Sequence, residues 1–208
     1  MAWQRQAVVS ITYTEVLDCW FGTPDSPAYR HWRAAWFKRD EAFDATIRQR
    51  FGSLTAAALR ADAEDASGQW AREPLQPLPA LARLLVLDQF TRNLYRDSAL
   101  SFAGDAQALQ LASRMVAAGL DRTLTGVQRL FVYLPYEHAE DLAHQHTSVQ
   151  LVTQLTADEP TLTEPLFWAH RYCETITRFG RFPHRNALLG RVSTAAERAF
   201  LDGEEDGR

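Results

Sequence analysis

Helix start and stop signals recur along the whole chain, and they constrain its fold more than any other feature. Four segments fit the capping-box pattern, in which a hydroxyl and a carboxyl or amide three residues later satisfy free backbone N–H groups. These pairs are Thr12 with Glu15, Thr125 with Gln128, Thr161 with Glu164, and Thr194 with Glu197. Glycines stand where helices should stop, namely Gly22, Gly68, Gly119 and Gly180.

Apolar residues repeat with the helical period between these signals, and no stretch alternates with the period of a strand. The pattern predicts helices over about 13–21, 27–37, 40–50, 53–67, 78–93, 104–118, 125–133, 136–155, 162–178 and 194–201. The Pro-rich run 73–79 is too short to demand two domains. The sequence therefore predicts a single all-α domain over 1–208, built from antiparallel helix pairs. We expect its core to include Trp20, Leu85, Phe90, Phe131, Leu142 and Ile176.

Composition narrows the class of protein. The chain has 208 residues, of which 46% are hydrophobic and 23% charged, the profile of a soluble globular protein. Its net charge of −4 makes nucleic acid an unfavoured partner and argues against binding to an anionic membrane. Cys19 and Cys173 form no disulfide framework, and both are expected to be buried thiols in a reducing compartment. No signal segment or membrane span is evident, so we expect a cytoplasmic protein of unknown oligomeric state.

An arginine-rich turn covers residues 178–191. Four arginines, a histidine and an asparagine lie within these fourteen residues, between aromatic and aliphatic anchors. Gly180 and Pro183 each end or redirect a helix. The segment is therefore interpreted as a shaped turn that holds guanidinium groups near one another.

Three predicted helices carry polar residues on their apolar faces. Asp88 and Arg92 form an (i, i+4) pair on the buried side of 78–93. His138, Asp141 and Gln145 share one face of 136–155, while Glu137, Glu140 and His144 point the other way, and His170 lies on an apolar face of 162–178. Buried charges need partners. We therefore expect Asp88, Arg92, His138, Asp141 and His170 to converge on arginines of the turn.

Two functions fit such a cluster. The first is a non-catalytic protein that binds a small anionic molecule or an acidic peptide, because arginine forks recognise carboxylate and phosphate. The second is a hydrolase or transferase for an anionic substrate, with His138 or His184 as general base, Asp141 orienting it, and Arg181 and Arg185 stabilising charge. The candidate ligand-binding residues are Asp88, Arg92, Arg96, Gln145, His170, Arg178, Arg181, Arg185, Asn186 and Arg191. A purely structural alternative stays open. In it, salt bridges of the turn hold the C-terminal end of the chain in place, and Asp88–Arg92 is a structural ion pair.

Other chemistries are disfavoured. Glu137, His138, Glu140, Asp141 and His144 are ligand-type residues, but their directions diverge, so no metal site is predicted. Neither a nucleophile motif nor a phosphate or dinucleotide loop is present, and no cofactor is expected. RNA binding through the basic stretch 171–198 conflicts with the acidic overall balance.

Four sequence blocks resemble the uncharacterised, mostly bacterial family called domain of unknown function 924. The blocks are Trp20–Phe21, Leu87–Arg96, Leu134–Asp141 and Arg178–Arg191. The family usually has proline where Thr91 stands and serine where Ala139 stands. The resemblance covers nearly the whole chain and implies an all-helical, tetratricopeptide-like architecture of antiparallel helix pairs. It implies no known reaction.

Overall fold

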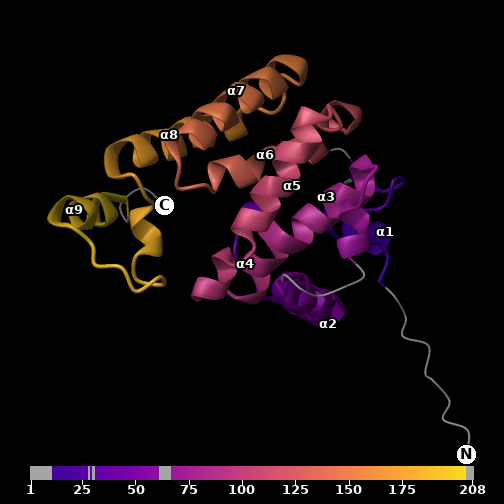
Figure 1. Cartoon of the computed structure of the whole chain (residues 1–208), viewed down its shortest axis with the longest axis horizontal. Coiled ribbons are helices and arrows are strands. Elements are labelled where there is room, and N and C mark those ends of the chain that lie inside the picture. The colour runs from indigo at the N-terminus through magenta and orange to yellow at the C-terminus, as the bar shows by residue number, and fades with distance from the viewer. Residues whose placement is uncertain (1–10, 28, 30, 61–66, 205–208) are drawn as a thin grey trace, which may run out of the picture.

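The computed structural model describes residues 11–27, 29, 31–60 and 67–204, and this part of the chain is helical with no strand (Figure 1). The predicted all-α class is thereby confirmed. The α-helices are α1 (Tyr13–Phe21), α2 (Glu41–Ala58), α3 (Pro77–Leu85), α4 (Thr91–Leu94), α5 (Asp105–Ala117), α6 (Gly126–Glu137), α7 (Leu142–Asp158), α8 (Glu164–Phe179) and α9 (Ala195–Glu204). Short 3-10 turns are η1 (Ala34–Phe37), η2 (Gly68–Ala71), η4 (Ala99–Phe102), η5 (Asp121–Thr123) and η6 (Pro183–Arg185), and η3 (Val86–Phe90) is π-helical.

Most of the predicted caps form as the sequence indicates. The Thr12 and Thr194 boxes are complete, and the Gln128 side chain accepts a hydrogen bond from the Thr125 N–H at 3.1 Å. The Thr161 box is wrong, because α8 starts after Thr163. Pro165 lies in the first turn of α8, where its fixed φ and missing N–H suit a helix start.

Four predicted helices have different bounds. The predicted helices 40–50 and 53–67 are largely one helix, α2, since Gly52 is tolerated inside it where η3 and α4 pack against α2. Residues 61–66, at the end of the second prediction, lie outside the described part. Of the predicted helix 27–37, the structure has only the turn η1, with residues 28 and 30 undescribed. The predicted helix 136–155 is broken, since α6 ends at Glu137 and α7 begins at Leu142.

The hydrophobic core lies between α1, α3, α5 and α6, with Trp20 at its centre. The Trp20 ring is fully buried, and its centroid lies 5.5 to 5.8 Å from those of Phe43, Phe90 and Phe131. Leu85 and Ile176 are also buried, as predicted. Leu142 is not a core residue: it is the first residue of α7, and 39% of its surface is exposed.

The C-terminal third of the chain covers one side of this core. α7 packs against both α6 and α8, and the segment after α8 turns back so that η6 and α9 lie at one end of the molecule (Figure 1). Cys19 and Cys173 are free and half-buried rather than buried. Within the described ranges, every helix is too short or too polar to cross a membrane.

Candidate functional site

The site begins at a π-helical turn in a continuous helical run. α3, η3 and α4 follow one another without a break, and the wider η3 turn contains Leu87, Asp88 and Gln89. The Thr91 hydroxyl donates to the carbonyl oxygens of Leu87 at 2.9 Å and Asp88 at 3.1 Å. Gly104 approaches so closely that a Cβ atom there would lie 2.1 Å from the Leu87 carbonyl oxygen. Such π-turns occur frequently at functional sites.

The Asp88 carboxylate is the centre of the polar cluster, and it is fully buried. Its Oδ1 lies 2.7 Å from Nδ1 of His138 and 3.2 Å from NH1 of Arg92, while the Gln89 amide donates to Oδ2. Burial alone would raise the pKa of Asp88, but Arg92 and His138 outweigh it and hold that pKa far below its usual range. Asp88 is therefore ionised.

His138 is held as a neutral imidazole. Burial and the charge of Arg92 lower the pKa of His138 below its ordinary value, despite the opposing effect of Asp88. Because an ionised carboxylate can only accept, the His138 Nδ1 carries the proton and donates it to Asp88. Nε2 is then the lone-pair nitrogen, which can accept a proton at neutral pH.

A second carboxylate, Asp105, joins two arginines. It follows Gly104 at the start of α5, and its Oδ1 lies 2.9 Å from NH1 of Arg92. Its Oδ2 accepts from NH1 of Arg185 at 3.2 Å. One chain of alternating charges thus runs from the core to the C-terminal turn, through Asp88, Arg92, Asp105 and Arg185.

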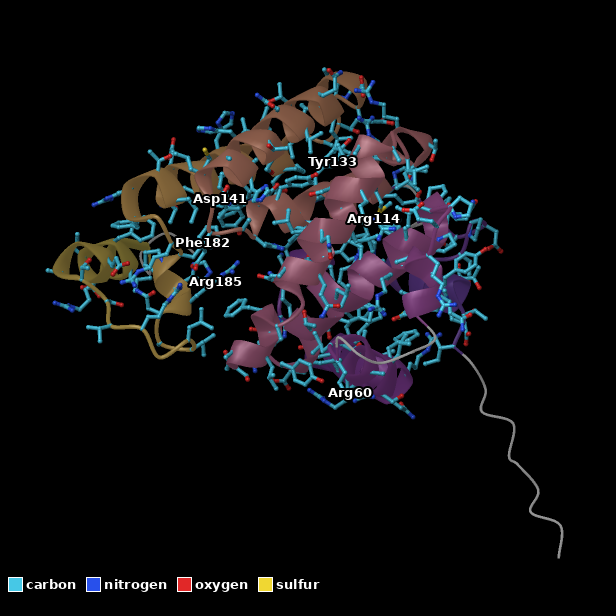
Figure 2. All side chains as sticks on the ribbon, viewed as in Figure 1. Arg60, Arg114, Tyr133, Asp141, Phe182 and Arg185 are labelled. Carbon is cyan, nitrogen blue, oxygen red and sulfur yellow. The ribbon has the colours of Figure 1, made fainter. Side chains whose placement is uncertain are left out.

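Arg185 is the arginine of the 178–191 turn that reaches this chain. Only 7% of its surface is exposed, and Figure 2 shows it beside Phe182 on the side of the C-terminal segment that faces the other helices. Its guanidinium carbon lies 4.5 Å from the ring centroid of Phe102 and 4.6 Å from that of Phe182. Its buried Nε has no hydrogen-bond partner among the residues that the structure describes. Burial lowers the pKa of Arg185, and Asp105 offsets this only in part.

Arg181 and Arg191 have structural partners instead. Nε and NH2 of Arg181 donate to the two carboxylate oxygens of Glu197 at 2.6 and 2.9 Å. Both terminal nitrogens of Arg191 donate to Glu140, at 2.6 and 2.9 Å, and Glu140 also accepts from the Phe182 N–H. These two pairs fix the shape of the turn around Arg185.

Several predicted placements are wrong because of the break between α6 and α7. His138 is the C-cap residue after α6, and Asp141 is the exposed N-cap of α7, where it accepts from the His144 N–H at 3.0 Å. His138 therefore faces Asp88 rather than Asp141. Glu137 was expected to point outward, but 2% of its surface is exposed.

The remaining predicted site residues are distributed around the cluster or away from it. Arg96 pairs with both carboxylate oxygens of Asp44. Gln145 is buried and donates to the Glu137 and Ala139 carbonyls, so it caps α6. The others are the exposed His170 on α8, Arg178 stacked on Phe179 and Phe200, His184 beside the Phe182 ring, and buried Asn186, which donates to Ser193.

A cavity of about 230 Å³ lies against this cluster. Aromatic side chains form part of its wall, namely Trp36, Phe37, Phe102, Tyr172 and Phe182. The polar part includes Gln89, Arg92, Arg96, Glu137, His138 and Arg185, and Asn93 and His184 also contribute. At about 30 Å³ per water molecule, this volume is about eight waters, so the cavity fits a small molecule.

Sequence reasoning missed three of these positions. Asp105 carries a signal, since an acid directly after a glycine is typical of a helix start. Glu137 adjoins His138, but its direction depends on where α6 ends. The placement of Gln89 at the cavity wall depends on the π-helical turn. No group of three or more His, Cys, Asp or Glu side chains in the described segments is arranged to hold a metal ion.

Fold and site together define an all-α protein with a small polar cavity at the junction of α4, α6 and the C-terminal turn. The chain belongs to the family described as bacterial protein of unknown function (DUF924), whose model matches residues 16–205. It is similar to a solved structure, the protein of unknown function ATU0120 from Agrobacterium tumefaciens. That similarity has 33% identity and a TM-score of 0.74, and covers 92% of this chain and 97% of the other. No curated protein matches.

Proposed function

We propose that this protein binds a small molecule with an anionic group in the cavity beside Asp88 and His138. The observation that carries the proposal is Arg185, a buried guanidinium held between two aromatic rings, whose Nε finds no hydrogen-bond partner in the described part of the chain. A buried N–H donor without a partner costs free energy, and a carboxylate or phosphate oxygen would remove that cost. The cavity volume favours a small molecule over an acidic peptide.

Acid–base catalysis on the same ligand is the second candidate. It is favoured by the 2.7 Å contact between Asp88 and His138, which leaves a neutral imidazole at the cavity wall. In this scheme Asp88 is a positioning residue, His138 accepts a proton through Nε2, and Arg185 stabilises negative charge. Asp88 thus takes the role that the sequence suggested for Asp141.

We also propose that α6, α7 and α8 form consecutive antiparallel pairs of the tetratricopeptide-like type. The support is that α7 packs against both neighbours and that short connections join the three helices.

Replacing Arg185 with Met is expected to abolish anion binding at little cost to the fold, because Arg92 still neutralises Asp105. Arg181→Met is the matched control: it should lower the melting temperature, since Glu197 loses its partner, but leave binding intact. Thermal melts with and without phosphate, sulfate and small carboxylates separate the two effects. A ligand at 100 times its dissociation constant should stabilise the wild type by about 2.7 kcal/mol and Arg185→Met by none. If no anion shifts the wild type and both variants melt far below it, the turn is purely architectural.

A further inference from the structure

Among the described residues, Glu137 is the acidic side chain of the cavity wall, and it forms no ion pair with an arginine there. It ends α6 beside His138, 2% of its surface is exposed, and its buried Oε1 makes no hydrogen bond of ordinary geometry among the described residues. The Ser148 hydroxyl is a neutral neighbour of this carboxyl and supplies no positive charge. The other carboxylates of the site, Asp88 and Asp105, are both paired with Arg92. Packing alone does not account for a buried carboxyl group here, because one without a positively charged partner is costly.

The electrostatic surroundings of Glu137 differ from those of Arg185. Burial and the negative charge of Asp88 raise the pKa of Glu137 to about 8, against the opposing effect of the Ser148 hydroxyl. At Arg185, by contrast, burial and the neighbouring Arg92 disfavour the positive charge, with Asp105 as partial compensation. The cavity wall therefore lacks a positive charge beside Glu137, and it lacks a full negative counter-charge beside Arg185.

We propose that the ligand of this cavity is zwitterionic, with an acidic group on Arg185 and an amine on Glu137. The inference rests on the proposed anion site and adds the second group of the ligand. An ammonium group would give Oε1 of Glu137 a charge-assisted donor and would lie near ionised Asp88. The acidic group would take the unpartnered Nε of Arg185. The aromatic side chains that form part of the cavity wall suit a short aliphatic segment.

Matched ligand pairs test this proposal by calorimetry. One series compares acetate, propionate, butyrate and valerate with glycine, 3-aminopropionate, 4-aminobutyrate and 5-aminovalerate, so that several chain lengths are sampled. A second compares propylphosphonate with 3-aminopropylphosphonate and separates carboxylate from phosphate-like ligands. At pH 8, the best amino compound should bind about tenfold tighter than its amine-free partner, which equals about 1.4 kcal/mol.

Glu137→Gln should reduce this preference to within about twofold while leaving the amine-free anion bound. Glu41→Gln, at an exposed position in the first turn of α2, is the control and should keep the full preference. The preference should also fall from pH 8 to pH 6, because protonated Glu137 is a poor partner for an ammonium group. Asp88 and Arg92 stay charged over this range. Burial and the charge of Arg92 lower the pKa of His138, and Glu137→Gln, which keeps His138, controls for its titration.

The outcomes separate the two proposals. If amine-free anions bind the wild type but not Arg185→Met, and the amine adds nothing, the zwitterion inference is overturned and the anion site stands. The same holds if Glu137→Gln keeps the full preference. If no member of either series binds, both proposals are wrong.

Discussion

Glu137→Gln is expected to make the protein more stable than the wild type at pH 8, by about 4 kcal/mol, and nearly equal to it at pH 5. The carboxyl of Glu137 titrates near its ordinary value of 4.5 in the unfolded chain and at about 8 in the folded protein. Between these values the folded state binds a proton that the unfolded state has released. This one group therefore lowers the stability of the wild type relative to Glu137→Gln by about 1.4 kcal/mol for each pH unit as pH rises through this window. Glutamine has a similar shape and no charge to desolvate.

Urea unfolding of both proteins at pH 5, 6, 7 and 8 measures this difference. The exposed Glu41→Gln variant should follow the wild type at every pH. A gap between Glu137→Gln and the wild type that stays constant with pH would show that Glu137 is ionised in the folded protein.

Asp88→Asn is expected to destabilise the fold by about 3 kcal/mol at pH 7, the lower end for breaking a buried pair. The fully buried carboxylate compensates Arg92 and accepts from His138, and Asp105 still compensates Arg92 after the change. The pH dependence of this stabilisation follows from the lowered pKa of Asp88 in the folded protein. The contribution of Asp88 to stability is present above its unfolded pKa of about 3.9 and is lost as the pH falls further. The variant should also lower the pKa of His138, because Asp88 raises it.

Asp141→Asn is the matched control for Asp88→Asn. Asp141 is an exposed N-cap, and asparagine caps helices about as well as aspartate, so this variant should keep its stability. Denaturant unfolding and an NMR titration of the His138 ring distinguish the two positions. A His138 pKa that moves in Asp141→Asn and stays fixed in Asp88→Asn would contradict the described site.

The helical period of the sequence predicted part of this site correctly. Asp88 and Arg92 were assigned to one buried helix face, and the structure pairs them, because four residues bring side chains to the same side of α-helical and π-helical turns alike. Trp20 and Phe131 were predicted in the core for the same reason, and both are fully buried. Local periodicity identifies the buried face of a helix.

The helical period could not predict the direction of side chains beyond a break in the helix that no glycine or proline marks. The chain leaves the helix after Glu137 without a glycine or proline at that point, since Pro135 lies inside α6. A single helix that continues across residues 138–141 would turn Glu137 outward and put Asp141 beside His138, as the sequence predicted. Both placements are wrong because α7 starts with its own cap and its own direction.

The partners of the arginine turn also lie beyond sequence reasoning. Arg181, Arg185 and Arg191 have the same chemistry, and their roles differ only because Glu197, Asp105 and Glu140 come from three different parts of the fold. Tertiary packing alone decides which guanidinium faces the cavity.

The most direct test of the anion site is an NMR titration that follows the Arg185 Nε–H resonance, assigned by its loss in Arg185→Met. Butyrate and propylphosphonate should shift this resonance in a saturable way, because the buried Nε–H gains an acceptor. The Arg181 Nε–H, which already donates to Glu197 at 2.6 Å, should stay in place. An Arg185 resonance that does not move while either anion binds elsewhere would contradict the central claim.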